Sequence, residues 1–438
     1  MKPVARLIPL LLTTLLHAHT LDLPTLLSLA LTHDPLLHAL SAEASAADAS
    51  RRQALASLLP SLGISASTAF QSDVPHATLT LPPPLGSLDI ELGETTTYQA
   101  GLLATWEWQL GMEGPSRLEA ASQTLTAARL HIAAREQELT RTILTLAFRY
   151  QLSLASTQSL QAALARLKAH HERLAALKAG GLASEKDELD LRIQLTQTAA
   201  RIEASEADSR LILRELALRC GLDRLDGLTL PQQLLAVLPP SSLESLRDRL
   251  PTLPAALTAR TQTLIREALL NAAQASWWPS LQIQAGATLQ YPGLSLTEDE
   301  ADILFTGRIG LTWPLFTSGA RTARIDEQKA RLEAARATYT QTLEDLTLAF
   351  DRLLEEAHTR YTTYEAARDV LTLEQRRHAI VQEEWRQGQT PLAALLEAEQ
   401  RLREAELGVQ QARYAYLLAY HQTRLFAGSP LLPQEETP

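Results

Sequence analysis

The sequence is poor in cysteine, methionine and aromatic residues. Its 438 residues include one cysteine, Cys220, two methionines and 5% aromatic residues. A single cysteine excludes an intrachain disulfide and a cysteine-rich metal site, so we expect Cys220 to be a small, buried apolar residue. The scarcity of methionine and histidine gives no support for a path of soft-metal ligands through the protein.

An excess of positive charge is also absent. Charged residues make up 21% of the chain, and the formal net charge is -10. Proteins that bind nucleic acid carry basic patches that neutralise phosphate groups. The composition therefore predicts no nucleic-acid partner.

Long hydrophobic runs are missing beyond the first twenty residues. No later segment has the roughly 18 consecutive apolar residues that a membrane-spanning helix needs. Residues 1–20 have a positive start (Lys2 and Arg6), an apolar run at 7–16 and Ala18 before a plausible cleavage site. This is the pattern of a secretory signal peptide, with an uncleaved N-terminal helix as the alternative. No cysteine follows that site to carry a lipid anchor.

Catalytic and cofactor-binding motifs are not found in the sequence. It has no serine elbow, phosphate loop, HExxH motif or EF-hand spacing. His170 and His171 are adjacent on a predicted helix, where neighbouring side chains point about 100° apart and do not readily bind one metal ion. The sequence therefore predicts no enzyme activity, no cofactor and no metal site.

The chain repeats one plan twice. Pro35 and Pro60 are 25 residues apart, as are Pro254 and Pro279, and the pentapeptide LTLAF occurs at 144–148 and again at 346–350. Such internal repetition determines the domain count better than length does. The predicted division is a signal peptide (1–20), a first repeat (21–220), a proline-rich connector (221–253), a second repeat (254–428) and a flexible tail (429–438). Each repeat is expected to contain a helix, a β-hairpin (60–110 or 279–316) and two long helices (116–178 and 184–220, or 319–386 and 391–425).

Four segments alternate apolar and polar residues, as strands with two different faces do. In residues 281–291, LQIQAGATLQY, one face is apolar and the other carries amide and hydroxyl groups. A half-buried strand of a soluble sheet would show this pattern, and so would a transmembrane strand of about 9–11 residues. The tip loops, 72–97 and 292–302, are expected to be solvated turns. Candidates for polar, lumen-facing side chains are Glu107, Gln282, Gln284 and Arg308.

Five of the six tryptophans lie at or near the strand ends that join the helices. They are Trp106, Trp108, Trp277, Trp278 and Trp313. Such clustering is typical of an aromatic belt at a membrane interface, although a core between sheet and helices is the alternative. Four strands cannot close a barrel, and an open sheet edge in lipid leaves backbone groups unpaired. If the strands cross a bilayer, several copies of the chain must therefore pool them.

The helical segments are long. Apolar residues recur every seven positions from Leu118 to Leu146 and, after Ser153, from Leu160 to Leu174, which predicts a coiled-coil seam. From Leu395 to Ala419, apolar residues follow spacings of three and four. Gly181 and Gly388 open the turns at the tips between the long helices of each repeat.

In this order and twice over, these motifs resemble the TolC family of outer-membrane efflux proteins. The resemblance rests on the duplicated PSL strands, WPLFTSG, the coiled coil, the glycine turns and the terminal RYAYLLAYHQTRLFAG, and it extends over about residues 21–428. It implies a mainly α fold with a four-stranded β contribution. It also implies a homotrimer with a shared outer-membrane β-barrel and a periplasmic α-barrel, docked on a periplasmic adaptor (membrane fusion protein) and an inner-membrane pump.

The resemblance also suggests gate residues. In this family, aspartates after the second glycine turn narrow the periplasmic end of the tube. Aligned on Gly388, the second of these acids falls on Glu397, whereas the first falls on Ala394; in the first repeat, Asp187 and Asp190 take the equivalent positions. A ring of carboxylates around a narrow bore would concentrate cations and repel anions. The alternatives are a solvated helix flank for Glu397 and helix-N-terminal carboxylates for both aspartates.

The implied function is passive export through the outer membrane, coupled to a pump and an adaptor. One alternative is a periplasmic coiled-coil adaptor or structural protein, which would leave the four amphipathic strands unexplained. A second is the outer-membrane duct of a type I protein secretion system. The sequence does not distinguish drugs, metal ions and polypeptides as cargo, since the partner pump would select it.

Overall fold

The computed structural model describes residues 21–74, 76–80, 82, 86–91, 94–180, 184–293 and 300–430. The predicted signal peptide, most of the predicted C-terminal tail and the tip residue Gly181 lie outside the described residues. The chain divides into a helical unit (1–40, 131–256 and 342–438) and a second unit (41–130 and 257–341) that contains a sheet. Within the described ranges, none of the helices combines the length and apolar content needed to cross a bilayer.

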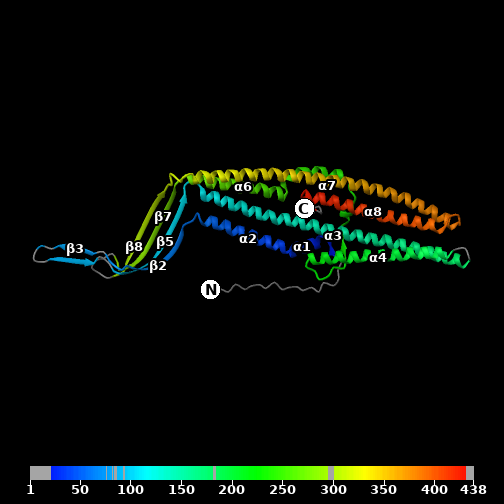
Figure 1. The fold of residues 1–438 in the computed structure, drawn as a ribbon, viewed down its shortest axis with the longest axis horizontal. Helices are drawn as coiled ribbons and strands as arrows, with labels where there is room; N and C mark the ends of the chain where they lie inside the picture. The colour runs from blue at the N-terminus through cyan, green and yellow to red at the C-terminus, as the bar shows by residue number, and fades with distance from the viewer. Residues whose placement is uncertain are drawn as a thin grey trace, which may run out of the picture. The chain divides into compact units, whose positions relative to one another are not determined.

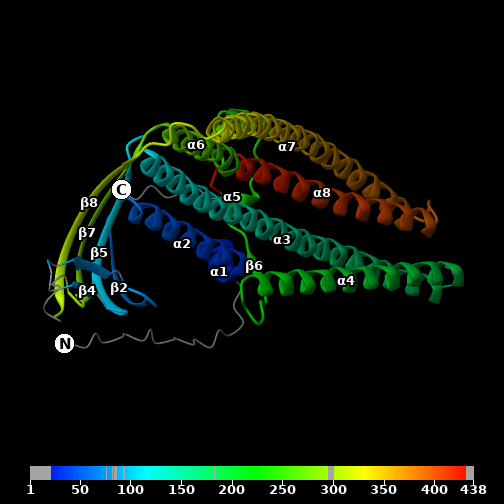
Figure 2. The same cartoon turned by 60° about the vertical axis from the view of Figure 1, so that its left-hand side comes forward.

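Two pairs of long helices have matching lengths. α3 (Glu113–Ala179) and α7 (Ala320–Arg386) have 67 residues each, and α4 (Glu185–Arg219) and α8 (Leu392–Phe426) have 35 each. Figures 1 and 2 show α4 returning alongside the C-terminal half of α3, and α8 alongside that of α7. The internal duplication predicted from the paired prolines is confirmed by these lengths.

The segment that precedes each hairpin is interrupted at a proline. α1 (Leu23–His33) gives way to α2 (Pro35–Ala56), and the 3-10 helix η1 (Pro240–Thr252) to α6 (Pro254–Gln274). Proline has no backbone N–H to donate, so it is favoured at the start of a helix. Asp34 caps the restarted helix, because its Oδ1 accepts hydrogen bonds from the backbone nitrogens of Leu36 and Leu37 at 2.8 and 3.0 Å. Its Oδ2 accepts from Arg135 of α3 at 2.7 Å.

The connector between the repeats has little regular structure apart from η1. Its other elements are α5 (Gln232–Leu235) and β6 (Leu228–Thr229), which pairs in parallel with β1 (Leu21–Asp22). A second short 3-10 helix, η2 (Ala275–Trp277), follows α6.

The core of the helical unit is the predicted coiled-coil seam. Its leucines at 139, 146, 160, 167 and 174 are each at most 4% exposed. On α8, the residues at the three- and four-residue spacings are buried at Leu395, Ala398, Leu402, Val409 and Tyr416. Cys220 packs into the same core, and burial raises the pKa of its thiol to about 11 because the thiolate would lose its hydration. The expectation of an inert, buried cysteine is confirmed.

The sheet of the second unit has four antiparallel strands in the order β2, β5, β7, β8. They are β2 (Ser61–Phe70), β5 (Thr96–Gln109), β7 (Ser280–Tyr291) and β8 (Asp302–Thr312). Figure 1 shows them side by side, each joined to a helix at the same end of the sheet. The two hairpins, one from each repeat, are therefore joined through β5 and β7 into one layer.

The first tip loop differs from the sequence expectation. Residues 72–97 were predicted to be a solvated turn, but they contain the antiparallel pair β3 (His76–Thr80) and β4 (Ser87–Glu91). The threonines of β3 favour a strand, whereas the prediction gave more weight to the prolines and glycine around them. Strand β8 also ends at Thr312, before Pro314, so Trp313 and Leu315 lie beyond the strand although the predicted hairpin extended to residue 316.

Candidate functional site

The register of the sheet places all of its regularly spaced apolar residues on one face. Residues opposite each other on neighbouring strands share a face, and one such row is Ile64, Leu102, Ala287 and Phe305. Another row contains Trp106, Ile283 and Ile309. Exposure on this face is high, at 83% for Ile64, 79% for Phe305 and 76% for Ile309. The alternation in each strand predicted one apolar and one polar face, and strand pairing combines the four apolar faces into one continuous surface.

The opposite face of the sheet is mainly polar. It brings together the four predicted lumen candidates, since Glu107 is opposite Gln282, and Gln284 is opposite Arg308. Because Gln282 and Gln284 are two residues apart on β7, their side chains are neighbours on the same face. Glu107 and Arg308 are exposed. These residues form a patch with one acid, one base and two amides, close to the helix-joined end of the strands.

The predicted tryptophans lie where the strands meet the helices. Four of them are exposed, at 46% for Trp108, 49% for Trp277, 60% for Trp278 and 56% for Trp313. Two indole nitrogens donate to backbone carbonyls, from Trp106 to Leu58 at 2.9 Å and from Trp313 to Trp277 at 3.0 Å. Trp313 therefore has its polar atom bonded and more than half of its surface exposed, whereas Trp106 is bonded but only partly exposed.

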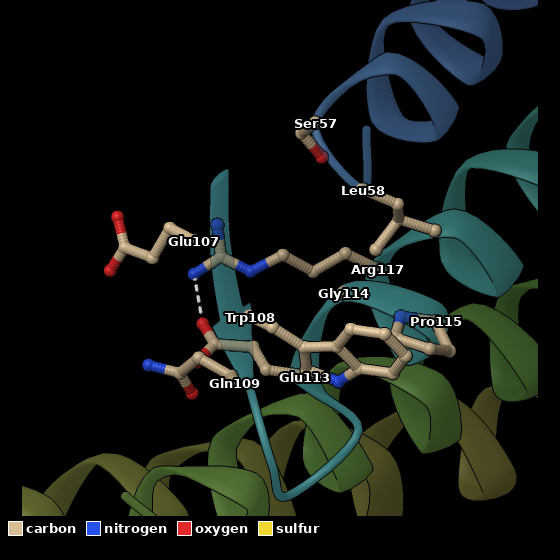
Figure 3. A pocket seen from close by; sticks show the side chains of 9 residues that line it. All are labelled: Ser57, Leu58, Glu107, Trp108, Gln109, Glu113, Gly114, Pro115 and Arg117. Atoms are coloured by element: carbon tan, nitrogen blue, oxygen red, sulfur yellow. Dashed lines mark hydrogen bonds and ion pairs between the residues drawn. The ribbon is translucent and has the colours of Figure 1, made fainter. Parts of the chain in front are cut away.

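A cavity of about 400 Å³ lies where β5 meets the first turn of α3. Figure 3 shows the indole of Trp108 beside it and the guanidinium of Arg117 reaching the carboxylate of Glu113, with Glu107 pointing away. Arg117 and Glu113 form an ion pair four residues apart on α3. The lining is therefore amphipathic, and its acid and base are already paired with each other.

The two tip turns are stabilised in different ways. At the α7–α8 turn, Gly388 adopts a φ of 74°, a conformation that suits glycine and ends a helix. Before α4, the hydroxyl of Ser184 accepts a hydrogen bond from the backbone nitrogen of Asp187 at 3.2 Å, and the Asp187 carboxylate accepts from the Ser184 backbone nitrogen at 3.1 Å. This capping box gives Asp187 a structural task at the helix N-terminus. Asp190 follows one turn later and is partly exposed.

Glu397, the gate candidate of the second repeat, lies on the surface of α8. Its side chain is 61% exposed and pairs with Arg401, one turn along, at 2.6 Å. A carboxylate with an adjacent guanidinium presents a much smaller net field than a lone carboxylate. The pairing therefore weakens the simple picture of an acidic ring at this position.

Two residues further along α8, Glu399 is at the centre of a buried polar cluster. Its Oε1 is 2.9 Å from Nε2 of His170 on α3 and 2.7 Å from Nε2 of His378 on α7. Its Oε2 accepts from Arg166 of α3 at 3.1 Å, and Arg166 also donates to Glu406 at 3.2 and 3.0 Å. Glu399, His170 and His378 are 4%, 5% and 7% exposed. Burial alone would raise the pKa of Glu399, but the hydrogen bonds from the two histidines and the charge of Arg166 outweigh it and hold that pKa below its usual range.

Sequence reasoning missed this cluster. It considered His170 together with His171, whereas the fold brings His170 to His378 and Glu399, more than 200 residues away in the chain. Glu399 was not singled out, because polar residues such as Glu397 and Gln400 surround it in the sequence. The only available signal was that Glu399 lies one position after Ala398, on the side of α8 that contains its apolar seam.

The sequence matches a known protein family over both repeats. The family model described as outer membrane efflux protein matches residues 26–221 and 244–429, once for each repeat. Protein CyaE of Bordetella pertussis is 29% identical over 207 residues, which are 47% of this chain and 40% of that protein. The match thus spans less than half the length of this relative.

Solved structures share the fold over nearly the whole chain. The outer membrane protein VceC of Vibrio cholerae superimposes with a TM-score of 0.74 at 19% identity, covering 94% of this chain and 97% of VceC. The MtrE outer membrane channel of Neisseria gonorrhoeae gives 0.74 at 18% identity, covering 93% of this chain and 89% of MtrE. Because the family model accounts for both repeats, the chain belongs to the TolC family of outer membrane efflux proteins, which are channels and not enzymes.

Proposed function

We propose that three copies of this chain form a passive export duct through the outer membrane, as the channel of a tripartite efflux system. The observation that carries this proposal is the continuous apolar face of the sheet, whose Ile64, Phe305 and Ile309 are more than three-quarters exposed. In water, an apolar surface of this kind favours association or aggregation. Against hydrocarbon it is the expected outer surface of a transmembrane strand.

The two sheet edges support the trimer. In the described part of the chain, β2 and β8 each pair with one neighbour only, β5 and β7 respectively. Unpaired backbone groups in hydrocarbon cost several kcal/mol each, so these edges need partners. Pairing β8 of one copy with β2 of the next satisfies both edges, and three copies of four strands give a closed barrel of twelve.

The two faces then have distinct tasks. The polar patch of Glu107, Gln282, Gln284 and Arg308 would line the water-filled lumen, where charged and amide groups keep their hydration. The exposed tryptophans would form the aromatic belt at the periplasmic interface, where an apolar ring with one polar atom is favoured. The helices would continue in the periplasm as a tube, and the chain would reach this location through its signal peptide.

The helix tips would meet the partners. A periplasmic adaptor and an inner-membrane pump would dock near the turns at Gly181 and Gly388, and the pump would select the cargo. Gating by Glu397, Asp187 and Asp190 is part of the proposal, with Glu397 acting together with Arg401. Because Asp187 also caps α4, Asp190 is the freer acid of the first repeat.

The proposal is tested by fractionation and conductance. The full-length protein should stay with the outer-membrane fraction after washing with urea, and the purified protein should conduct ions in planar bilayers. Phe305→Arg should reduce the amount of inserted protein, whereas Thr306→Arg, on the polar face of the same strand, should have little effect. Release of the wild-type protein by urea, or bilayers that stay silent, would contradict a membrane channel and favour a periplasmic adaptor.

A further inference from the structure

The geometry points to a transition-metal site in the wall of the helical unit, formed by His170, His378 and Glu399. Both histidines direct Nε2 at the same carboxylate oxygen, at 2.9 and 2.7 Å. The three candidate ligand atoms all lie within 4.8 Å of one another, and all three residues are buried. This inference is independent of the proposed export function.

The donor set suits a borderline divalent ion. Two imidazole nitrogens and one carboxylate oxygen bind Zn²⁺ at about 2.0–2.2 Å, with a fourth position for water. Tetrahedral bonds of that length separate neighbouring ligand atoms by about 3.3 Å. Each histidine nitrogen therefore needs to move only about half an ångström further from Oε1 of Glu399 to admit the ion, which rotations of the imidazole and carboxylate groups can supply. Co²⁺, Ni²⁺ and Cu²⁺ prefer similar ligands.

The surroundings hold the carboxylate in a binding orientation. Arg166 donates to Oε2 of Glu399 at 3.1 Å, which leaves Oε1 facing the histidines. Such outer hydrogen bonds to metal ligands are a regular feature of protein metal sites. The charge of Arg166 is met by Glu406, to which it makes two hydrogen bonds, so the negative charge of Glu399 stays available for a cation.

One charge opposes the ion. Arg403 lies one turn further along α8, and its guanidinium donates to Thr198 of α4 at 3.1 Å. The formal charges of Arg166, Arg403, Glu399 and Glu406 sum to zero. We therefore expect the ion to be held by its bonds to the ligand atoms and not by a strong negative field. This favours Zn²⁺, Co²⁺, Ni²⁺ and Cu²⁺ over Ca²⁺ or Mg²⁺.

The site would fasten three helices near their tips. His170 is nine residues from the end of α3, His378 eight from the end of α7, and Glu399 seven after the start of α8. On the tip side, the cluster that contains Leu174, Trp385 and Leu395 is buried, and the ring of Trp385 meets that of His170 edge-on at 5.6 Å. A metal ion here would crosslink the two helical hairpins of one chain inside a dry shell.

The first experiment uses the wild-type protein. The purified, full-length channel without an affinity tag is stripped with a chelator and titrated with Co²⁺ alone and then with Zn²⁺. We expect one ion per chain, the visible absorption of four-coordinate Co²⁺, and displacement of that signal by Zn²⁺. X-ray absorption at the zinc edge should count two imidazole ligands. No binding, or a shell without two imidazoles, would overturn the site and leave a hydrogen-bonded cluster.

Variants then assign the ligands. Loss of a residue that only hydrogen-bonds to a metal ligand weakens metal binding by about 10–100-fold. His170→Gln and His378→Gln each remove a ligand and should therefore weaken Zn²⁺ binding by more than this. His171→Gln is the matched control, because His171 is adjacent in sequence but lies outside the cluster, and it should bind as the wild type does. Equal affinity in all three variants would overturn the assignment. If a variant fails to fold, the ligand count of the wild-type protein still decides the question.

Discussion

The sheet and the helical unit have opposite arrangements of polarity. In the sheet, large apolar residues such as Ile64, Phe305 and Ile309 are exposed. In the helical unit, charged and polar residues such as Glu399, Arg403 and His378 are buried, each at most 7% exposed. One sequence therefore folds one region for an apolar environment and another for water.

The largest expected effect separates two acids on the same helix. With a chelator present, Glu399→Ala should lower the free energy of unfolding by about 3–5 kcal/mol, because it leaves two buried histidines without their shared acceptor and removes one of the two carboxylates that pair with Arg166. Glu397→Ala removes an exposed pair with Arg401 and should cost less than about 1 kcal/mol. Chemical denaturation followed by circular dichroism measures both. Similar losses for the two variants would show that Glu399 is not held in a dry interior.

The second prediction tests the outer face of the sheet. Phe305→Arg places a charge at mid-strand on the apolar face and should destabilise the membrane-inserted protein by about 2–4 kcal/mol. Thr306→Arg changes the adjacent residue on the polar face and should cost far less. Heat resistance of the oligomer on gels, together with yield in the membrane fraction, provides the comparison. Equal tolerance of both arginines would remove the distinction between the faces.

The third prediction concerns a buried histidine of the helical unit. The ring of His421 is 2% exposed, stacks on Phe148 and donates from Nε2 to the carbonyl oxygen of Leu234 at 3.0 Å. Burial lowers its pKa from 6.5 to about 4, although the bond to Leu234 acts in the opposite direction. Between these two values the unfolded chain binds more protons, so stability falls as pH falls through that window, by up to roughly 3 kcal/mol.

Thermal unfolding between pH 4 and 7 measures this dependence. His421→Gln should reduce the loss of stability on acidification, and His171→Gln, which changes a partly exposed histidine, should retain the wild-type slope. An unchanged slope in His421→Gln would show that other groups cause the acid sensitivity.

The smallest expected effect is at the gate candidate. If Glu397 faces the bore, Glu397→Ala should raise the open-state current slightly and shift ion selectivity toward anions, because the charge of Arg401 is then uncompensated. Arg401→Ala should shift selectivity toward cations. Reversal potentials in a salt gradient measure both shifts. Unchanged currents and potentials in the two variants would place the pair on the outer wall of the tube.

The periodic parts of the fold were predictable from the sequence. The two-residue period of 281–291 predicted β7, and the seven-residue period from Leu118 predicted the buried face of α3, because each depends on local geometry alone. The duplication was visible in the spacing of Pro35 and Pro254 from the prolines that follow them. The β3–β4 pair was missed because its strands are short and surrounded by turn-forming residues.

The contacts between distant segments were not predictable. Apart from the position of Glu399 beside the apolar seam of α8, little in the local sequence distinguishes it from Glu397, since both lie in a segment rich in charged residues. Glu399 is buried because it contacts α7 and also α3, a helix that begins more than 200 residues earlier in the chain. For this reason, we considered from the sequence only the adjacent His171 as a partner of His170. The register that joins the four apolar strand faces also became visible only once the strands were paired.

The most direct test of the central claim is a crosslink between the two sheet edges. Within one chain, β2 and β8 are separated by two strands, about 14 Å apart and beyond the reach of a disulfide. Ser65→Cys is combined in turn with Leu304→Cys, Thr306→Cys and Arg308→Cys, and the membranes are oxidised; the native Cys220 is buried and does not interfere. We predict that at least one pair gives a ladder that ends at three chains. Only uncrosslinked chains in every pair, or a ladder that continues beyond three, would contradict a sheet completed by two sister copies.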